Sequence, residues 1–400
     1  MAEEQNPSPI TPLLAWATRF HASDLHLKVG TPPSVRVDGR LTRQTELPAL
    51  TPESLHKVIL CLLPAHLRAA FEEGRELDFT YECPDQARYR VSLCRSSGQP
   101  SLVLRQIPLV LPSWERLAIP EIAKKLMRRG GGLVLVSGST GSGKSTTVAA
   151  LVDQLNSGIG GHVVTLEDPI EHRHVERECI ISQREIGVDC ASYHEGLRRA
   201  LRQDPDVIVL GELRDTETIQ LAITAAGTGH LVLATLHTTG GPQSVDRVVD
   251  AFAPDVRAPI RAQLAATLVG VVSPCLFPRI GGGRIPAFEL MMVTEAVRGC
   301  IREGKTHQLH NLLQTGSTQG MLRMTNEIAE LVRRGVVSED DAMTLCPDPE
   351  SLERIMISGL TPLRSRRPAQ SEEPIEPMTS PSPPEPDRES SNLLKKLHRS

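Results

Sequence analysis

The chain has 400 residues, 40% hydrophobic and 23% charged, which is enough apolar material for two or three globular domains. Its formal net charge of −4 argues against binding nucleic acid by bulk electrostatic attraction. No apolar run reaches the length of about 18 residues typical of a transmembrane helix, and the acidic start does not resemble a secretory signal. Eight cysteines without a C-x-x-C pair argue against a zinc knuckle and favour reduced cytosolic thiols.

Residues 1–112 alternate short apolar runs with turns, which predicts a small α+β domain. We expect two strands, at 34–39 and 87–95, and two helices, at 52–63 and 64–74. A stretch with three prolines at 107–120 is the predicted linker to the rest of the chain.

From 113 to 285, apolar strands alternate with helical patterns, which predicts an α/β domain with a parallel sheet covered by helices on both faces. The expected strands lie at 131–138, 162–168, 206–212 and 229–237. Residues 286–366 show mostly helical patterns and are predicted to form a helical subdomain. Residues 367–400 are rich in proline, serine and glutamate, which predicts a disordered tail.

The segment GSTGSGKST, residues 138–146, matches the P-loop pattern and lies between an apolar strand and a helix. Its glycines allow backbone N–H groups to converge on phosphate oxygens at a helix N-terminus. Lys144 is predicted to reach the outer phosphates of ATP, and the Ser145 hydroxyl to bind Mg²⁺. The candidate nucleotide-binding residues are Gly138, Ser139, Thr140, Gly141, Ser142, Gly143, Lys144, Ser145 and Thr146.

Acidic residues follow two of the expected strands, at the sheet edge where ligands bind. Glu167, Asp168 and Glu171 follow the strand ending near 166, and could order Mg²⁺ and activate water or form a solvated acidic turn. Glu212 follows the strand 207–210, and the residues alone leave open which acid does the chemistry. His237 ends a further strand, where a single histidine is more often structural.

These segments together resemble the PilT-type ATPases within the type II/type IV secretion ATPase family. The resemblance extends over about residues 12–345, including an N-terminal match at 22–41. The segments TLEDPIE and GHLVLATLHTT resemble the Asp-box and the His-box of the family. The pattern L-R-x-x-P-D, an apolar strand and G-E-x-R-D is present as Leu201, Arg202, Pro205, Asp206, Gly211, Glu212, Arg214 and Asp215.

The resemblance implies a PAS-like N-terminal domain followed by a RecA-like ATPase core. It implies that Glu212 holds Mg²⁺ through water and that Glu171 activates the attacking water. His237 is expected near the γ-phosphate, with His230 as a weaker candidate. Two arginines of the N-terminal domain, Arg90 and Arg105, are expected to meet nucleotide phosphates as subunits close.

Members of this family form hexameric rings, so the resemblance implies a homohexamer on the cytoplasmic side of the inner membrane. It implies a motor that turns the pilus platform protein and withdraws pilin subunits, which drives twitching motility. The linker at 107–120 is then the expected hinge. A paralogous retraction ATPase is a further possible partner, and no nucleic acid is expected.

Three alternatives remain open at this level: an assembly or secretion ATPase, an accessory PilU-type subunit of a mixed ring, and a DNA-remodelling RecA-like ATPase. The sequence has no four-cysteine motif, and we expect no long N-terminal extension of the kind that assembly and secretion relatives carry. The segment AVRGCIRE, 296–303, resembles a retraction-type segment but departs from it at Gly299 and Cys300. Gly227 stands where the family usually has glutamate, which would remove a carboxylate near the His-box.

Overall fold

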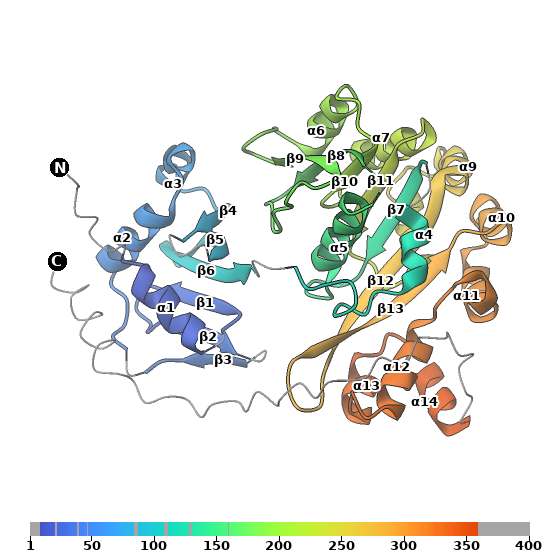
Figure 1. The fold of residues 1–400 in the computed structure, drawn as a ribbon. Coiled ribbons are helices and arrows are strands. Elements are labelled where there is room, and N and C mark those ends of the chain that lie inside the picture. The colour runs from blue at the N-terminus through green and yellow to red at the C-terminus, as the bar shows by residue number, and fades with distance from the viewer. Residues whose placement is uncertain are drawn as a thin grey trace. The chain divides into compact units, whose positions relative to one another are not determined.

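The computed structural model describes residues 9–358, apart from residues 21, 38–39, 46, 84–86, 108–110, 128–129 and 159. The tail expected at 367–400 lies outside the described residues. Contacts divide the chain into two compact units between residues 110 and 111, within the stretch expected to be the linker. Each unit is described by itself (Figure 1).

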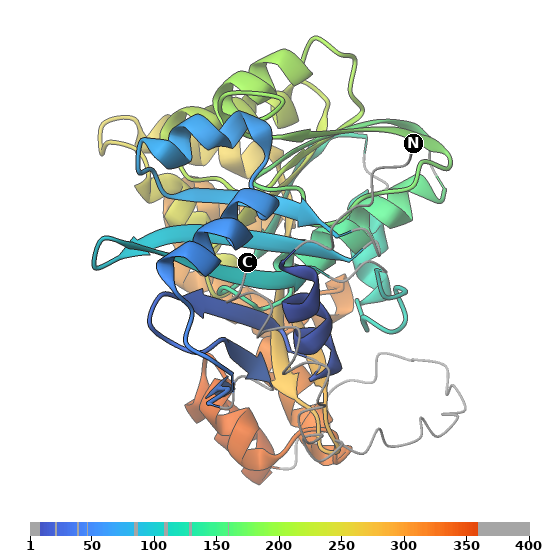
Figure 2. The same ribbon diagram turned by 90° about the vertical axis from the view of Figure 1, so that its left-hand side faces the viewer.

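The N-terminal unit is built on a six-stranded sheet of order β3-β2-β1-β6-β5-β4 (Figure 2). All of its neighbouring strands are antiparallel, which is the PAS-like arrangement that was predicted. Its strands are β1 Asp24–Lys28, β2 Ser34–Val37, β3 Arg40–Arg43, β4 Leu77–Glu82, β5 Arg88–Ser96 and β6 Gln99–Ile107. Its helices are α1 Thr11–Arg19, α2 Pro52–Leu62, the short 3-10 helix η1 Ala65–Leu67 and α3 Arg68–Glu72.

The start of helix α2 is set by its local sequence. Thr51 Oγ1 accepts a hydrogen bond from the Ser54 backbone N–H at 3.1 Å, and Ser54 Oγ accepts one from the Thr51 N–H at 3.0 Å. Pro52 follows at the first helical position, where its missing N–H costs nothing. The apolar face of α2 then packs into the core of the unit together with the central strand β6.

The second unit contains a seven-stranded sheet of order β13-β12-β7-β11-β10-β8-β9. All neighbours are parallel except β13, which pairs antiparallel with β12. The strands are β7 Gly132–Ser137, β8 Gly161–Glu167, β9 Cys179–Glu185, β10 Val207–Leu210, β11 Leu231–Leu236, β12 Leu268–Pro278 and β13 Arg284–Met292. Its first helices are η2 Glu121–Ala123, α4 Lys124–Met127, α5 Lys144–Asn156, α6 Tyr193–Ala200, α7 Thr216–Gly227, α8 Gly241–Asp250 and α9 Arg257–Thr267.

Helices cover both faces of this sheet because its crossovers run in both directions across it. The connections from β7 to β8 and on to β9 move one way across the sheet, and those from β9 through β10 and β11 to β12 move back. Since parallel crossovers are right-handed, α5 lies on one face while α6, α7 and α9 pack in a row on the other (Figure 1). The strands between these layers are buried on both faces, as Val134 and Ile208 illustrate at 0% exposure.

The strand order is RecA-like, as predicted, because β11 lies between β7 and β10. The parallel strands β7, β11, β10 and β8 all end at the same edge of the sheet. Segments that follow different strands in the sequence are therefore brought into one row at this edge.

Two features of the second unit differ from the sequence-based expectation. The expected boundary at 285–286 falls inside β13, which belongs to the sheet, so the helical part begins only after Met292. Strand β9 was not expected, because as an edge strand it lacks a buried apolar run, and Ile180 is 65% exposed. The helical part comprises α10 Glu295–Glu303, η3 Thr306–Gln308, α11 Leu309–Thr315, η4 Gly316–Gln319, α12 Met324–Arg333, α13 Glu339–Leu345 and α14 Pro349–Ser358.

Candidate nucleotide site

The P-loop joins β7 to the N-terminus of α5. Gly143 precedes the helix with φ of 99°, a left-handed conformation that favours glycine, and no side chain caps α5. A Cβ atom at Gly138 would collide with Ser142 Oγ. The first N–H groups of α5 thus have no intrahelical acceptor, and a helix N-terminus of this kind suits phosphate oxygens.

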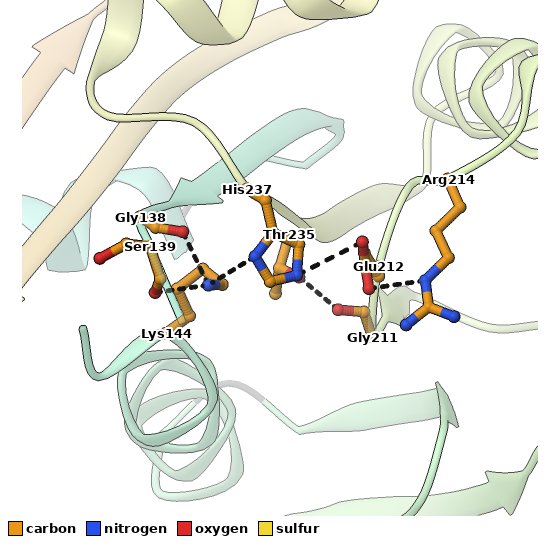
Figure 3. Close-up of polar contacts among 8 residues, drawn as sticks. All are labelled: Gly138, Ser139, Lys144, Gly211, Glu212, Arg214, Thr235 and His237. Carbon is orange, nitrogen blue, oxygen red and sulfur yellow. Dashed lines mark hydrogen bonds and ion pairs between the residues drawn. The ribbon is translucent and has the colours of Figure 1, made fainter. Parts of the chain in front are cut away.

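Lys144 is the first residue of α5, and its ammonium group turns back over the loop (Figure 3). Its Nζ donates to the carbonyl oxygens of Gly138 at 2.7 Å and Ser139 at 2.9 Å. It also lies 3.4 Å from His237 Nδ1. The cation is therefore held at the mouth of the loop.

His237 connects the P-loop to the acid that follows β10. Its Nε2 lies 3.4 Å from Glu212 Oε1, and the other carboxylate oxygen of Glu212 accepts from Arg214 Nε at 2.8 Å (Figure 3). The neighbouring loop is tied to β11, because the Thr235 hydroxyl donates to the Gly211 carbonyl oxygen. The contacts Lys144–His237–Glu212–Arg214 thus run continuously along the sheet edge.

Burial lowers the pKa of Lys144, and the negative charges of Glu212 and Glu171 oppose this effect. Glu171, which follows β8, therefore lies within electrostatic reach of the P-loop lysine. Two of the acids singled out from the sequence and the lysine act on one another across the site.

Glu167, the first acid after β8, is engaged by its own neighbours. Its Oε1 accepts from Thr165 Oγ1 at 2.7 Å and from Gln183 Nε2 at 3.0 Å, and burial raises the pKa of its carboxyl group. In the part of the chain that the structure describes, no three His, Cys, Asp or Glu side chains gather as a metal site would require. The three-carboxylate Mg²⁺ cluster considered for Glu167, Asp168 and Glu171 is therefore not formed.

The residues present do fit Mg²⁺ bound in the manner of P-loop enzymes. Ser145 is exposed in the first turn of α5, beside Lys144. Glu212 is 19% exposed and already shares its carboxylate with His237 and Arg214, which suits contact with a metal through water better than direct ligation.

Two residues that the sequence associated with the His-box, Gly227 and His230, lie far from His237. Gly227 ends α7, before β11 begins, whereas His237 follows the end of β11, so about 20 Å of strand separates the two positions. His230 lies at the same distant end, where its Nδ1 is 3.1 Å from the Ala225 carbonyl oxygen at the last turn of α7. Both residues precede the strand in sequence, and neither lies at the edge that carries the site.

The departures in the segment 296–303 leave its helix intact. Helix α10 continues through Gly299, around which a side chain would meet open space. Arg298 donates to the carbonyl oxygens of Ala265 at 2.7 Å and Ala266 at 2.9 Å, near the end of α9. The segment therefore braces α9 despite Gly299 and Cys300.

The two arginines expected to meet nucleotide phosphates are cross-strand neighbours in the N-terminal unit. Arg90 on β5 pairs in register with Arg105 on β6. Arg105 Nε also donates to Asp24 Oδ1 at 2.7 Å, and Asp24 is only 4% exposed. This buried carboxylate orients the guanidinium of Arg105, and no signal in the sequence had singled it out.

Glu289 on β13 is a further acid that the sequence did not reveal. Its Oε1 accepts from the Gly241 backbone N–H at 2.9 Å, where α8 begins after the His237 loop, and burial raises the pKa of its carboxyl group. Ionised Glu289 therefore lowers the free energy of unfolding at neutral pH. This destabilisation disappears as the pH falls through the raised pKa of the folded protein toward 4.5, the pKa of the same group in the unfolded chain.

We expect wild-type protein to gain stability relative to Glu289→Gln as the pH is lowered from about 8 to about 5. The gain should be about 1.4 kcal/mol for each pH unit by which the pKa is raised. Thermal denaturation of both proteins across this range measures it. Parallel pH profiles for the two proteins would contradict the raised pKa.

The sheet order, the P-loop and the acids at the ends of neighbouring strands define a RecA-like P-loop nucleoside triphosphatase. The profile of the family described as type II/IV secretion system protein matches residues 84–281. The type IV pilus retraction ATPase PilT of Pseudomonas aeruginosa is 44% identical over 342 residues, which cover 86% of this chain and 99% of that protein. The type IV pilus ATPase PilU of the same organism is 36% identical, over 84% of this chain and 87% of PilU.

Among solved structures, the pilus retraction motor PilT with bound ADP matches with a TM-score of 0.76 and 39% sequence identity. The match covers 86% of this chain and 98% of that one. The chain belongs to the PilT-type ATPases of the type II/IV secretion family.

Proposed function

We propose that the protein is the ATP-hydrolysing motor of type IV pilus retraction and acts as a homohexamer. The observation that carries this proposal is the unbroken set of contacts from Lys144 through His237 to Glu212. It occurs in a chain that is 44% identical to a PilT over nearly the whole of that protein.

Each site residue has a proposed task. The P-loop backbone, residues 138–146, cradles the phosphates of ATP, and Lys144 neutralises the charge of the outer ones. Ser145 holds Mg²⁺, and Glu212 does so through water. Bound Mg²⁺ supplies charge neutralisation on the phosphate oxygens. Glu171 accepts a proton from the attacking water.

His237 is proposed to report the state of the phosphates. Its ring lies between the Lys144 ammonium and the Glu212 carboxylate, so a change in the position of either group alters the hydrogen bonds of the other through one side chain. Arg90 and Arg105 are proposed to complete the phosphate contacts as subunits of the ring close. Domain closure of this kind would turn ATP turnover into movement.

The proposed partners are the other five copies of the chain in the ring, an inner-membrane platform protein and, in mixed rings, a paralogous retraction ATPase. The proposed location is the cytoplasmic face of the inner membrane. None of the helices in the described part of the chain is both long and apolar enough to cross a bilayer.

A genetic experiment tests the biological role. Deleting the gene in its host should leave extended pili that no longer retract and should abolish twitching motility. Re-expression of the wild-type chain should restore both, whereas Lys144→Ala should restore neither. Retraction that persists in the deletion strain would contradict the assignment as the main motor. Restoration by Lys144→Ala would instead favour the accessory, PilU-type role, since hydrolysis by this chain would then be dispensable.

A further inference from the structure

The edge strand β9 lies directly beside the strand that delivers Glu171. Its residues pair in register with β8, so that Thr165 faces Gln183 and Glu167 faces Glu185. Alternate residues of a strand point to the same side, and these four side chains therefore share one face of the sheet. The segment 168–174, which carries Glu171, leaves the end of β8 next to them.

Gln183 uses its side-chain amide to hold this segment. Its Nε2 donates to the His172 carbonyl oxygen at 2.8 Å and to Glu167 Oε1 at 3.0 Å. Its Oε1 accepts from the His174 backbone N–H at 2.9 Å. Both donor hydrogens and the acceptor are engaged, so the partners fix the orientation of the amide.

The neighbouring acids hold the other side of Glu171. The Ile170 backbone N–H donates to Glu185 Oε2 at 3.1 Å. The Glu171 backbone N–H donates to the carboxylate of Glu167, whose position is fixed in turn by Thr165 and Gln183. Backbone groups before, at and after Glu171 are thus tied to side chains of β8 and β9.

We infer that Gln183 is a positioning residue that sets where the Glu171 carboxylate points. The inference rests on the proposed role of Glu171 as the base. Proton transfer from water requires a hydrogen bond of about 3 Å, and a misplacement of about 1 Å can lower a rate by about 100-fold. Gln183 acts on Glu171 through the backbone of the segment 168–174. Gln183 therefore orients the base and does not itself touch the reacting atoms.

The chemistry of position 183 is specific to an amide. A carboxylate there would face the Glu167 carboxylate and the His172 carbonyl oxygen, so that acceptors would meet acceptors. A methionine side chain has similar length and would lose all three hydrogen bonds. Neither change touches the P-loop, because β11, β10 and β8 lie between β7 and β9, which places the strands about 19 Å apart.

Steady-state ATP hydrolysis by the full chain carrying Gln183→Met or Gln183→Glu tests the inference. We expect kcat to fall by about 10- to 100-fold while the KM for ATP and the affinity for ADP change by less than about threefold. Gln220→Met is the matched control, since Gln220 on α7 donates its amide to Gln263 Oε1 at 3.1 Å, away from this segment. It should keep wild-type kcat. A Gln183 variant with wild-type kcat, or with a loss confined to KM, would overturn the inference.

A double-mutant cycle separates positioning from a general loss of structure. If Gln183 acts through Glu171, then adding Gln183→Met to Glu171→Gln should lower the single-turnover rate by less than about twofold further. Additive losses would mean that Gln183 acts elsewhere and would overturn the inference alone. Wild-type turnover by Glu171→Gln would overturn the base assignment itself, and the inference with it.

Discussion

Replacing Lys144 with alanine is expected to lower kcat for ATP hydrolysis by about 100- to 1,000-fold. The ammonium group is held at the mouth of the P-loop by the Gly138 and Ser139 carbonyl oxygens, next to His237. Its removal takes away the positive charge that the terminal phosphates require as charge moves onto their oxygens. Phosphate release from the purified full chain measures the effect.

The substitution should leave the fold intact. Lys144 is half-buried at the start of α5, and alanine is the best helix former, so a matching melting temperature is expected. Lys125→Ala is the matched control, because Lys125 is an exposed lysine on α4. Equal rates of hydrolysis by Lys144→Ala and Lys125→Ala would show that the P-loop lysine takes no part in the reaction.

Glu171→Gln should stop hydrolysis while nucleotide binding continues. Glutamine keeps the size of the side chain but cannot accept a proton at neutral pH, and loss of a general base costs about 100- to 10,000-fold in rate. The ADP affinity should stay within about threefold of wild type, since Glu171 follows β8 and lies outside the P-loop. Single-turnover hydrolysis and equilibrium ADP binding together distinguish the two effects.

The exposed Glu178, which lies shortly before β9, provides the control for this change. Glu178→Gln should hydrolyse ATP at the wild-type rate. If instead Glu171→Gln is fully active and Glu212→Gln is inactive, the proton chemistry belongs to Glu212, and the proposed division between the two acids is reversed.

The elements that the sequence predicted well are those whose pattern is local. The buried parallel strands are continuous apolar runs, so β7, β8, β10 and β11 were expected close to their observed bounds. The P-loop motif likewise placed the helix α5 directly after it. Strands β9, β12 and β13 were missed. The first of these is a half-exposed edge strand, and the hairpin of the other two is recognised only by its pairing with the sheet.

The contrast between local sequence patterns and strand pairing also explains which features of the site were predicted. Lys144 and His237 were singled out by motif, but their contact depends on β11 lying beside β7, and that of His237 with Glu212 on β10 lying beside β11. His230 was misplaced because it is close to His237 in the sequence and yet lies, like Gly227, at the opposite end of β11. Distance along a strand separates residues that a motif groups together.

Gln183 and Glu289 had no sequence signal, and Asp24 lies in the N-terminal match at 22–41 without being singled out there. Each is an ordinary polar residue whose importance comes from a partner far along the chain: Arg105 for Asp24, the segment after β8 for Gln183, and Gly241 for Glu289. Phosphate-binding chemistry follows from residue types at short spacings, because backbone N–H groups and one lysine within nine residues suffice for it. The orientation of the catalytic acids follows from strand order and register, because these bring hydrogen-bond donors and acceptors together across the sheet.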